Sequence, residues 1–513
     1  MISAFRKENL ICGVAAAVSA LLLWAAYPPH SETFSVLVAL VPMVVLSRVS
    51  SPRRSLASFF FFGLVYWMLS LSWMPAIIKN NGPWPLVVLG WFALAAYCAL
   101  YFAAYGWIVS HIWRKRSLSP QVPAVACIFA EAAVWVALEY LRATLLSGFA
   151  WNFLGTAFAG MPSFATPARF GGVYLVSALA LLLNGVFATL LVRVFAPVAG
   201  WDVPVSRSAS AMVRRLSQMG ETAMPLLFIL GCLTSGGRIV RNEAAVRAAS
   251  PAHLRVALVQ RNAACCFKPG PRENAIEAFG KLMDSVSAVK PDLVVMAESA
   301  LAEFGDVRSF RARDAVREFF GRSGARYIIA GGDDTVSNRT YNAVALYERG
   351  VDGPVDVYHK QHLVPFGEYI PLDKVFPALQ KLSPIGVSLH PGEPGLFALK
   401  TSCGREVKVA PLICYEDTDP RLSAQAERMG AGMIVLVTND SWFSESSEAQ
   451  AHAAQAVLRA VETGLPVVRV GNSGVTGVIR PDGSANWLSD AAGRIVVDGR
   501  GVMVETVAVN TEE

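Results

Sequence analysis

Charged residues are scarce in this chain of 513 residues. Asp, Glu, Lys and Arg make up 16% of it and hydrophobic residues 54%, where a soluble globular domain has roughly 25% and 45–50%. This balance excludes a disordered, collagen-like or coiled-coil protein. Because the apolar excess lies before about residue 240, a chain that is soluble throughout is excluded as well.

Several familiar motifs are also missing. No two cysteines lie three positions apart, so neither a zinc site nor a thioredoxin-like redox pair is expected, and the spacing of the 8 cysteines gives no disulfide framework. The sequence has no Walker loop, Rossmann fingerprint or serine nucleophile elbow. It also lacks a basic stripe interleaved with aromatic residues, so the net charge of +6 does not indicate nucleic-acid binding.

Long apolar stretches fill the first half of the chain. We expect seven of them to cross a membrane, at about 10–27, 33–49, 56–78, 84–112, 122–141, 172–196 and 223–240. Arg6 and Lys7 before the first stretch would also fit a signal peptide, but the stretches that follow favour an uncleaved helix. The sequence thus predicts an α-helical transmembrane bundle over residues 1–242.

Lys and Arg gather in every second connection between these stretches, for example at residues 53–54 and 114–116. The positive-inside rule then places the N-terminus in the cytoplasm and everything beyond about residue 241 outside the inner membrane. This orientation depends on the last span, which is short and is diluted by the polar and small residues 234–237. If that span did not cross, the second half would be cytoplasmic.

The connection after the fifth span is unusual. Glu139 and Arg142 lead into the aromatic segment 147–152. An ionisable residue near the end of a span hints at a function. A structural pair at helical spacing, with interfacial aromatic residues, fits equally well.

After about residue 253 short β-branched runs alternate with helical segments, which predicts an α/β domain over residues 253–510 with its sheets covered by helices. The predicted strands are Arg255–Gln260, Asp292–Glu298, Tyr327–Gly331, Tyr341–Tyr347, Val355–His359, Val407–Cys414, Met433–Thr438, Pro466–Val470, Val475–Arg480, Arg494–Val497 and Met503–Val509, and the predicted helices are about 272–289, 311–323, 419–429 and 446–463.

A chemically reactive side chain stands at or directly after the end of three of these predicted strands, namely Glu298, Lys360 and Cys414. In open α/β sheets that edge is where sites form. Taken singly, each has an ordinary alternative: a capping carboxylate, a solvated loop or a buried structural cysteine. Taken together in one domain, they indicate a nucleophile with acid–base partners.

Cys414 needs help to react, because a free thiol is only a few per cent ionised at pH 7. Glu298 follows an apolar strand, and its desolvation should raise its pKa towards the range of a general base. Lys360 could stabilise an oxyanion, with Glu368 holding it in place. His359 and His362 suggest a metal pair, but no third ligand is suitably spaced, so neither a metal nor another cofactor is expected.

The sequence around these residues resembles the nitrilase (carbon–nitrogen hydrolase) superfamily, whose members use a Glu–Lys–Cys triad in an αββα sandwich. Over about residues 10–510 the chain is similar to its membrane-embedded members, the apolipoprotein N-acyltransferases. The runs that carry this resemblance are 362–371 (HLVPFGEYIP), 413–416 (ICYE) and 438–443 (TNDSWF), with Tyr341-Asn342 and the segment 139–151 also fitting.

The resemblance implies a role for each matching residue of the core of the site. Glu298 corresponds to the general base, Lys360 to the lysine of the triad, and Cys414 to the nucleophile that becomes a thioester. Glu368 and Glu416 correspond to supporting carboxylates.

Four further residues match the family pattern around this core. Asn342 and Tyr415 are expected to support the site, and the backbone N–H of Tyr415 could help to hold an oxyanion. Trp442 and Phe443 correspond to aromatic residues near the mouth of the site, where substrate binds. Packing in the core is the alternative role for this aromatic pair.

The resemblance further implies a ping-pong reaction in which Cys414 takes an acyl chain from a phospholipid and passes it to the α-amine of the N-terminal S-diacylglyceryl-cysteine of an apolipoprotein. The expected partners are therefore a phospholipid donor, a diacylated apolipoprotein acceptor and the membrane. The protein is expected to be a monomer in the bacterial inner membrane, with its catalytic domain on the periplasmic side.

Two other readings stand beside this one. A membrane-tethered nitrilase-type amidase would transfer the acyl group to water, but it would not need the fused membrane half. A lipid- or lipoprotein-binding module with a decayed site would have lost Glu298, Lys360 or Cys414, and all three are present.

Two features depart from the family pattern. Family members usually carry a further transmembrane helix after the catalytic domain, and no apolar stretch of spanning length follows residue 253 here, so we expect the C-terminus to lie outside the membrane. The segment after the first strand usually offers a tryptophan to the acyl site. Here it reads Cys265-Cys266-Phe267-Lys268-Pro269, and we expect Phe267 to substitute.

Overall fold

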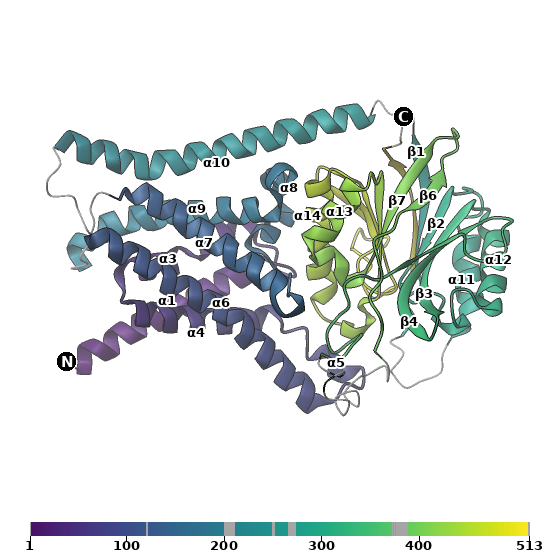
Figure 1. The fold of residues 1–513 in the computed structure, drawn as a ribbon, viewed down its shortest axis with the longest axis horizontal. Coiled ribbons are helices and arrows are strands. Elements are labelled where there is room, and N and C mark those ends of the chain that lie inside the picture. The colour runs from purple at the N-terminus through teal and green to yellow at the C-terminus, as the bar shows by residue number, and fades with distance from the viewer. Residues whose placement is uncertain are drawn as a thin grey trace. The chain divides into compact units, whose positions relative to one another are not determined.

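The computed structural model describes residues 2–118, 122–199, 211–248, 252–264, 273–371, 373, 375 and 388–510. The segment 265–269, with Phe267, lies outside these residues. The chain divides into two compact units, Met1–Ile239 and Val240–Glu513. Figure 1 shows that the first is helical and that the second is built on β-sheets.

Helices make up the first unit. They are α1 (Ile2–Ala25), α2 (Val36–Ala39), α3 (Val41–Val49), α4 (Pro52–Ser70), α5 (Ala76–Lys79), α6 (Trp84–Leu118), α7 (Ala124–Thr144), α8 (Pro162–Ala165) and α9 (Ala168–Ala199), followed by α10 (Ala211–Ala248), which contains the boundary between the units. Five of the seven predicted spans fall on one helix each, whereas 33–49 covers α2 and α3 and 56–78 covers most of α4 and most of α5.

Within the described residues, five helices are long and apolar enough to cross a membrane: Glu8–Ala25, Trp84–Ser117, Ala124–Ser147, Ala168–Pro197 and Ser217–Arg247. This measure gives five candidate spans among the described residues, where the sequence predicts about seven. The predicted span 33–49 is a shorter apolar stretch, Thr33–Val49. Helix α4 is not among the five because its first turn carries Arg53 and Arg54. These apolar helices make the chain a membrane protein.

Two charged side chains near the end of α7, Glu139 and Arg142, are buried and make hydrogen bonds to the backbone. Glu139 accepts a hydrogen bond from the Leu154 backbone N–H at 2.7 Å. Arg142 donates to the carbonyls of Phe149 and Trp151 at 2.6 and 2.8 Å. The two charged residues singled out in the sequence therefore hold the irregular segment that follows α7.

The described residues of the second unit contain two six-stranded sheets. Their orders are β12-β1-β2-β3-β4-β5 and β11-β10-β9-β8-β7-β6. The strands are β1 (His253–Gln260), β2 (Leu293–Met296), β3 (Tyr327–Val336), β4 (Arg339–Glu348), β5 (Asp356–His359), β6 (Phe397–Lys400), β7 (Glu406–Ile413), β8 (Met433–Thr438), β9 (Val467–Gly471), β10 (Gly477–Ile479), β11 (Ala485–Trp487) and β12 (Gly501–Ala508).

The two sheets face each other across an apolar core. Side chains from both sheets, such as Val256 and Leu293 from one and Val409 and Val435 from the other, belong to one buried apolar cluster. Three strands at the centre of each sheet are parallel, β1-β2-β3 and β7-β8-β9. Parallel strands need a crossover connection, usually a helix, and the helices lie on the outer faces.

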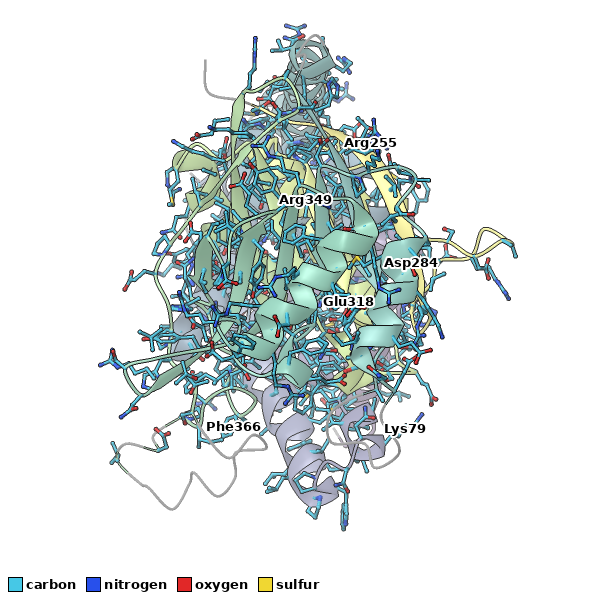
Figure 2. All side chains as sticks on the ribbon, turned by 90° about the vertical axis from the view of Figure 1, so that its right-hand side faces the viewer. Lys79, Arg255, Asp284, Glu318, Arg349 and Phe366 are labelled. Carbon is cyan, nitrogen blue, oxygen red and sulfur yellow. The ribbon has the colours of Figure 1, made fainter. Side chains whose placement is uncertain are left out.

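Helices α11 (Ala275–Asp284) and α12 (Phe310–Ser323) cover the first sheet, and α13 (Pro420–Arg428) and α14 (Glu448–Thr463) cover the second (Figure 1). On the solvent side of α11 and α12, Arg322 pairs with both Asp284 and Glu318, two residues labelled in Figure 2. The αββα sandwich predicted from the sequence is therefore confirmed.

Three details of the strand assignment were wrong. The short strands β6 and β11 were missed. They have only four and three residues, alternate residues of β6 are exposed, and β11 is only half-buried. The predicted strand 494–497 contributes only an isolated bridge between Ile495 and Ser489, since this segment is a largely exposed turn.

Candidate active site

Three strand ends bring the predicted triad together. Glu298 lies just beyond β2, Lys360 directly follows β5 and Cys414 directly follows β7. The first two strands belong to one sheet and the third to the facing sheet. The Lys360 Nζ atom lies 4.0 Å from Glu298 Oε1, and the charges of both residues act on Cys414. Glu298 and Lys360 are buried, whereas Cys414 is half-buried.

Glu368 is a second carboxylate that contacts Lys360. Its Oε1 atom accepts hydrogen bonds from Lys360 Nζ at 2.9 Å and from Asn342 Nδ2 at 2.7 Å. Its Oε2 atom accepts one from the Val364 backbone N–H at 2.8 Å. Asn342 Nδ2 also donates to Glu298 Oε1 at 2.7 Å, so one amide group links the two carboxylates.

Glu416 connects the two sheets at this edge. Its carboxylate is fully buried and accepts hydrogen bonds from the backbone N–H groups of Gln361, His362 and Ile413 at 2.6, 3.1 and 2.7 Å. The Tyr358 hydroxyl group donates to it at 3.0 Å. The segment after Lys360 is thereby fixed to the end of β7, where the cysteine stands.

The backbone at Cys414 adopts a left-handed conformation, with φ at 52°. A residue other than glycine adopts this region only at a cost of order 1–3 kcal/mol, and such strain gathers at functional sites. The turn that follows, a 3-10 helix over Cys414–Thr418, reverses the chain directly after the strand. The cysteine therefore stands at the outer corner of a sharp turn.

Burial controls the ionisation of the triad. It raises the pKa of the Glu298 carboxyl group, an effect that Lys360 partly opposes and Glu368 reinforces. Burial also raises the pKa of the Cys414 thiol well above its usual range, with Glu298 adding to the rise. Burial alone would lower the pKa of Lys360, but the nearby carboxylates of Glu368 and Glu298 raise it. At neutral pH the cysteine is a thiol and the lysine a cation.

The remaining predicted residues lie nearby. The ring of Tyr415 meets that of His362 edge-on at 5.4 Å. Trp442 and Phe443 are half-buried in a short 3-10 helix, Asp440–Phe443, and neither belongs to the two buried clusters of the sandwich.

The two histidines considered as a metal pair contact different carboxylates. His359 Nε2 lies 2.7 Å from Asp334 Oδ2, and His362 Nδ1 lies 3.5 Å from Asp419 Oδ2. His359 also stacks on the ring of Tyr341, with centroids 4.1 Å apart. Each ring is thus placed by its own neighbours.

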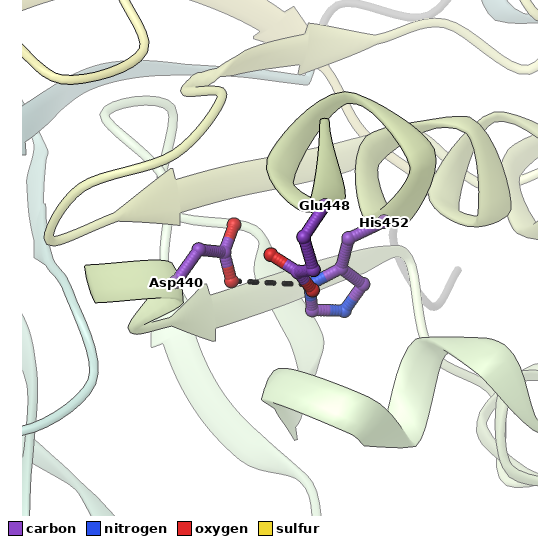
Figure 3. Close-up of side chains that lie close together, drawn as sticks. All are labelled: Asp440, Glu448 and His452. Carbon is purple, nitrogen blue, oxygen red and sulfur yellow. Dashed lines mark hydrogen bonds and ion pairs between the residues drawn. The ribbon is translucent and has the colours of Figure 1, made fainter. Parts of the chain in front are cut away.

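Sequence reasoning missed a second buried cluster, three of whose members, Asp440, Glu448 and His452, are shown in Figure 3. His452 on α14 lies between Asp440 and Asp417, with Nδ1 3.1 Å from Asp440 Oδ1 and Nε2 2.9 Å from Asp417 Oδ1. Glu448 approaches Nδ1 to 3.6 Å, and Arg469 contacts both aspartates at 3.1 Å. The only signal in the sequence was a glutamate and a histidine four residues apart in an alanine-rich helix.

Comparisons with known proteins cover both units. The family model for the N-terminal domain of apolipoprotein N-acyltransferases matches residues 19–186, and the model for carbon–nitrogen hydrolases matches residues 320–506. The apolipoprotein N-acyltransferase of Geobacter metallireducens is 29% identical over 503 residues, which is 94% of this chain and 88% of that protein. The chain belongs to the apolipoprotein N-acyltransferase family.

Other family members match at similar levels. The apolipoprotein N-acyltransferase of Gloeobacter violaceus is 28% identical, covering 94% of this chain and 87% of that protein. That of Azotobacter vinelandii is 29% identical, covering 87% and 81%. Among solved structures, an amidase of the nitrilase superfamily from Nesterenkonia aligns with 50% of this chain and 92% of its own, with a TM-score of 0.37 and 16% identity.

Proposed function

We propose that this enzyme is an apolipoprotein N-acyltransferase that moves a fatty acyl chain from a phospholipid to the α-amine of the N-terminal S-diacylglyceryl-cysteine of an apolipoprotein. The observation that carries the proposal is the approach of Glu298, Lys360 and Cys414 at facing strand ends, in a chain that matches the family over both of its halves. We assign residues 1–242 to the transmembrane domain and 253–510 to the catalytic domain.

The first half-reaction loads the enzyme. Glu298 takes the proton of Cys414, whose raised pKa keeps it a thiol until a base acts. The sulfur then attacks the ester carbonyl carbon of the phospholipid, forming the C–S bond. As the tetrahedral intermediate collapses, the C–O ester bond breaks, and Glu298 returns the proton to the departing oxygen of the lysophospholipid.

The second half-reaction unloads it. The α-amine of the diacylglyceryl-cysteine attacks the thioester carbon while Glu298 accepts a proton from the nitrogen. The C–N bond forms and the C–S bond breaks, and the sulfur recovers that proton. Lys360, which stays a cation in its buried position, together with the backbone N–H of Tyr415, stabilises the oxyanion in both steps.

The supporting residues hold the reacting groups in place or border the site. Glu368 and Asn342 hold Lys360 and Glu298 in register through their shared hydrogen bonds. Trp442 and Phe443 border the place where the acyl chain and the lipopeptide enter. The phospholipid donor and diacylated lipopeptide both reside in a membrane, which explains why a catalytic domain of this fold is fused to apolar helices. We place the enzyme, as a monomer, in the bacterial inner membrane with its catalytic domain in the periplasm.

The test is acyl transfer by the full-length protein in detergent, given phosphatidylethanolamine and a synthetic diacylated lipopeptide. The expected products are the triacylated peptide and a lysophospholipid in equal amounts, with none from Cys414→Ala. Release of free fatty acid with no acylated peptide would instead support the amidase alternative and overturn the proposal.

A further inference from the structure

The buried cluster around His452, three of whose side chains are drawn in Figure 3, contacts Asp417, three residues after the nucleophile, at 2.9 Å. Its two aspartates begin or belong to the two short helices of the site: Asp417 to Cys414–Thr418 and Asp440 to Asp440–Phe443. His452 Nε2 also lies 3.3 Å from the backbone carbonyl oxygen of Cys414. The imidazole of His452 therefore contacts the turn of the nucleophile on one side and the start of the short helix Asp440–Phe443 on the other.

The charges of this cluster balance internally. His452 and Arg469 supply two positive charges, and Asp417 and Asp440 two negative ones. Burial would lower the pKa of His452, but Asp417 and Asp440 raise it to about 10, so the ring is protonated. Burial also raises the pKa of the fifth group, Glu448, and the charge of Asp440 adds to this rise, which favours the neutral carboxyl group.

A metal ion fits this balance poorly, although Asp440, Glu448 and His452 offer ligand atoms within 4.8 Å of one another. A histidine binds a metal through a nitrogen lone pair, and both ring nitrogens of His452 here donate to carboxylates. Arg469 Nη2 already pairs with Asp440 Oδ2 at 3.1 Å. The ring protons of His452 and the guanidinium group of Arg469 therefore occupy the positions that a metal ion would need.

The cluster also explains how strain at Cys414 persists. A left-handed residue stays in that conformation only when its surroundings over-determine it. The turn after Cys414 is held at Asp417 by both His452 and Arg469, and Asp440 is held by the same two residues and by the Thr438 hydroxyl group at 2.7 Å. These contacts are charge-assisted and buried, which makes them the strong kind.

We propose that His452 is a positioning residue, which fixes the backbone of Cys414 and thereby aims its sulfur at Glu298 and Lys360. This role of His452 rests on the acyltransferase function proposed above in one respect only, namely that the positioned thiol of Cys414 carries the acyl group. Its central step, the geometry of Cys414, is measurable without any lipid substrate.

Two variants of His452 separate the contacts of the imidazole. In His452→Gln the amide nitrogen takes the place of Nε2, so the donor towards Asp417 and the Cys414 carbonyl remains. In His452→Asn it takes the place of Nδ1, so only the donor towards Asp440 remains. Because the turn of the nucleophile is on the Nε2 side, the glutamine variant should preserve more of its geometry.

Thr463→Ala is the matched stability control. Thr463 is buried on the same helix, where its hydroxyl group donates to the Arg459 carbonyl at 2.8 Å and accepts from the Leu465 N–H at 3.2 Å. It stands 11 residues beyond His452, roughly 16 Å along the helix. Its loss should lower the melting temperature without reaching the active site.

The measurement is the second-order rate of alkylation of Cys414 by iodoacetamide, followed by mass spectrometry of the peptide that contains it, in the full-length protein below its melting temperature. We expect His452→Asn to slow alkylation about 10- to 100-fold, by misplacement of the thiol, His452→Gln to slow it less, and Thr463→Ala to leave it unchanged. Dialysis against a chelator should change neither the rate nor the melting temperature.

Three results would overturn the proposal. If both His452 variants melt earlier but alkylate at the wild-type rate, His452 only stabilises the fold. If the two variants are slowed equally, the Nε2 contacts do not control the turn. If a chelator lowers the melting temperature, or Zn²⁺ raises it, the cluster is a metal site. Failure of acyl transfer in the wild-type protein, with these alkylation results intact, would count against the function alone.

Discussion

Replacing Glu368 by glutamine tests how the lysine of the triad is held. The substitution keeps the shape of the side chain but removes the charge that Lys360 Nζ contacts at 2.9 Å. A charge-assisted hydrogen bond contributes about 1.5–3 kcal/mol, and each 1.36 kcal/mol is tenfold in rate. We therefore expect formation of the acyl-enzyme to slow about 10- to 150-fold.

The same substitution should move the pH dependence of that step. Glu368 raises the pKa of Glu298 by repulsion between like charges, so its removal lowers this pKa. The base must be ionised to act, and the acidic limb of the rate profile should therefore shift to lower pH even as the plateau falls.

Rapid-quench mass spectrometry of the acyl-enzyme between pH 4 and pH 8, on wild type and Glu368→Gln, measures both effects. Asp314→Asn is a suitable control, because Asp314 lies on α12 and pairs only with the exposed Arg317 among the ion pairs described for it. A wild-type plateau, or an acidic limb shifted to higher pH, would refute this reasoning about Glu368.

Three further outcomes follow from the same contacts. Glu416→Gln should lower the free energy of unfolding by about 1–3 kcal/mol for each N–H donor that then faces an amide nitrogen, seen as a lower melting temperature. Gly474→Ala should slow alkylation of Cys414, because Gly474 has a φ of 113° and a methyl group there would overlap the Asp440 carboxylate. The stabilisation by protonated His452 is complete below about pH 6.5 and is lost as the pH rises towards 10. The difference in melting temperature between wild type and His452→Gln should therefore shrink across that range. A constant difference would contradict the positive charge assigned to His452.

The triad was predictable because each of its members stands at or just after the end of a strand, a position that a linear pattern reveals. Glu298 and Cys414 follow the apolar strands β2 and β7, and Lys360 follows the more polar strand β5. Resemblance to a family then supplied the roles of Glu368 and Glu416, and the hydrogen bonds of the structure give both of them partners that fit a supporting position.

The His452 cluster could not be predicted in this way. Its members come from a turn, a second turn, a helix and strand β9, so that Asp417 and Arg469 are far apart in the chain and adjacent in space. Nothing in a local pattern distinguishes a buried charged residue that has a distant partner from an exposed one, because the partner decides the burial.

The membrane half shows a similar limit. Its helical segments were predicted from apolar length alone, but the number of spans depends on how a helix such as α4 is counted, because α4 combines an apolar body with Arg53 and Arg54 in its first turn. Hydropathy sums over such a helix, whereas the contacts of the individual side chains decide where it can lie.

The central claim is that Cys414 carries the acyl group. Its most direct test is the intact mass of the detergent-purified protein after incubation with phosphatidylethanolamine, with Cys414→Ala alongside. The account predicts a gain of one acyl chain that hydroxylamine removes, that the alanine variant lacks and that a diacylated lipopeptide discharges onto its own amine. A folded wild-type protein that gains no mass, or an alanine variant that gains the same mass, would contradict it.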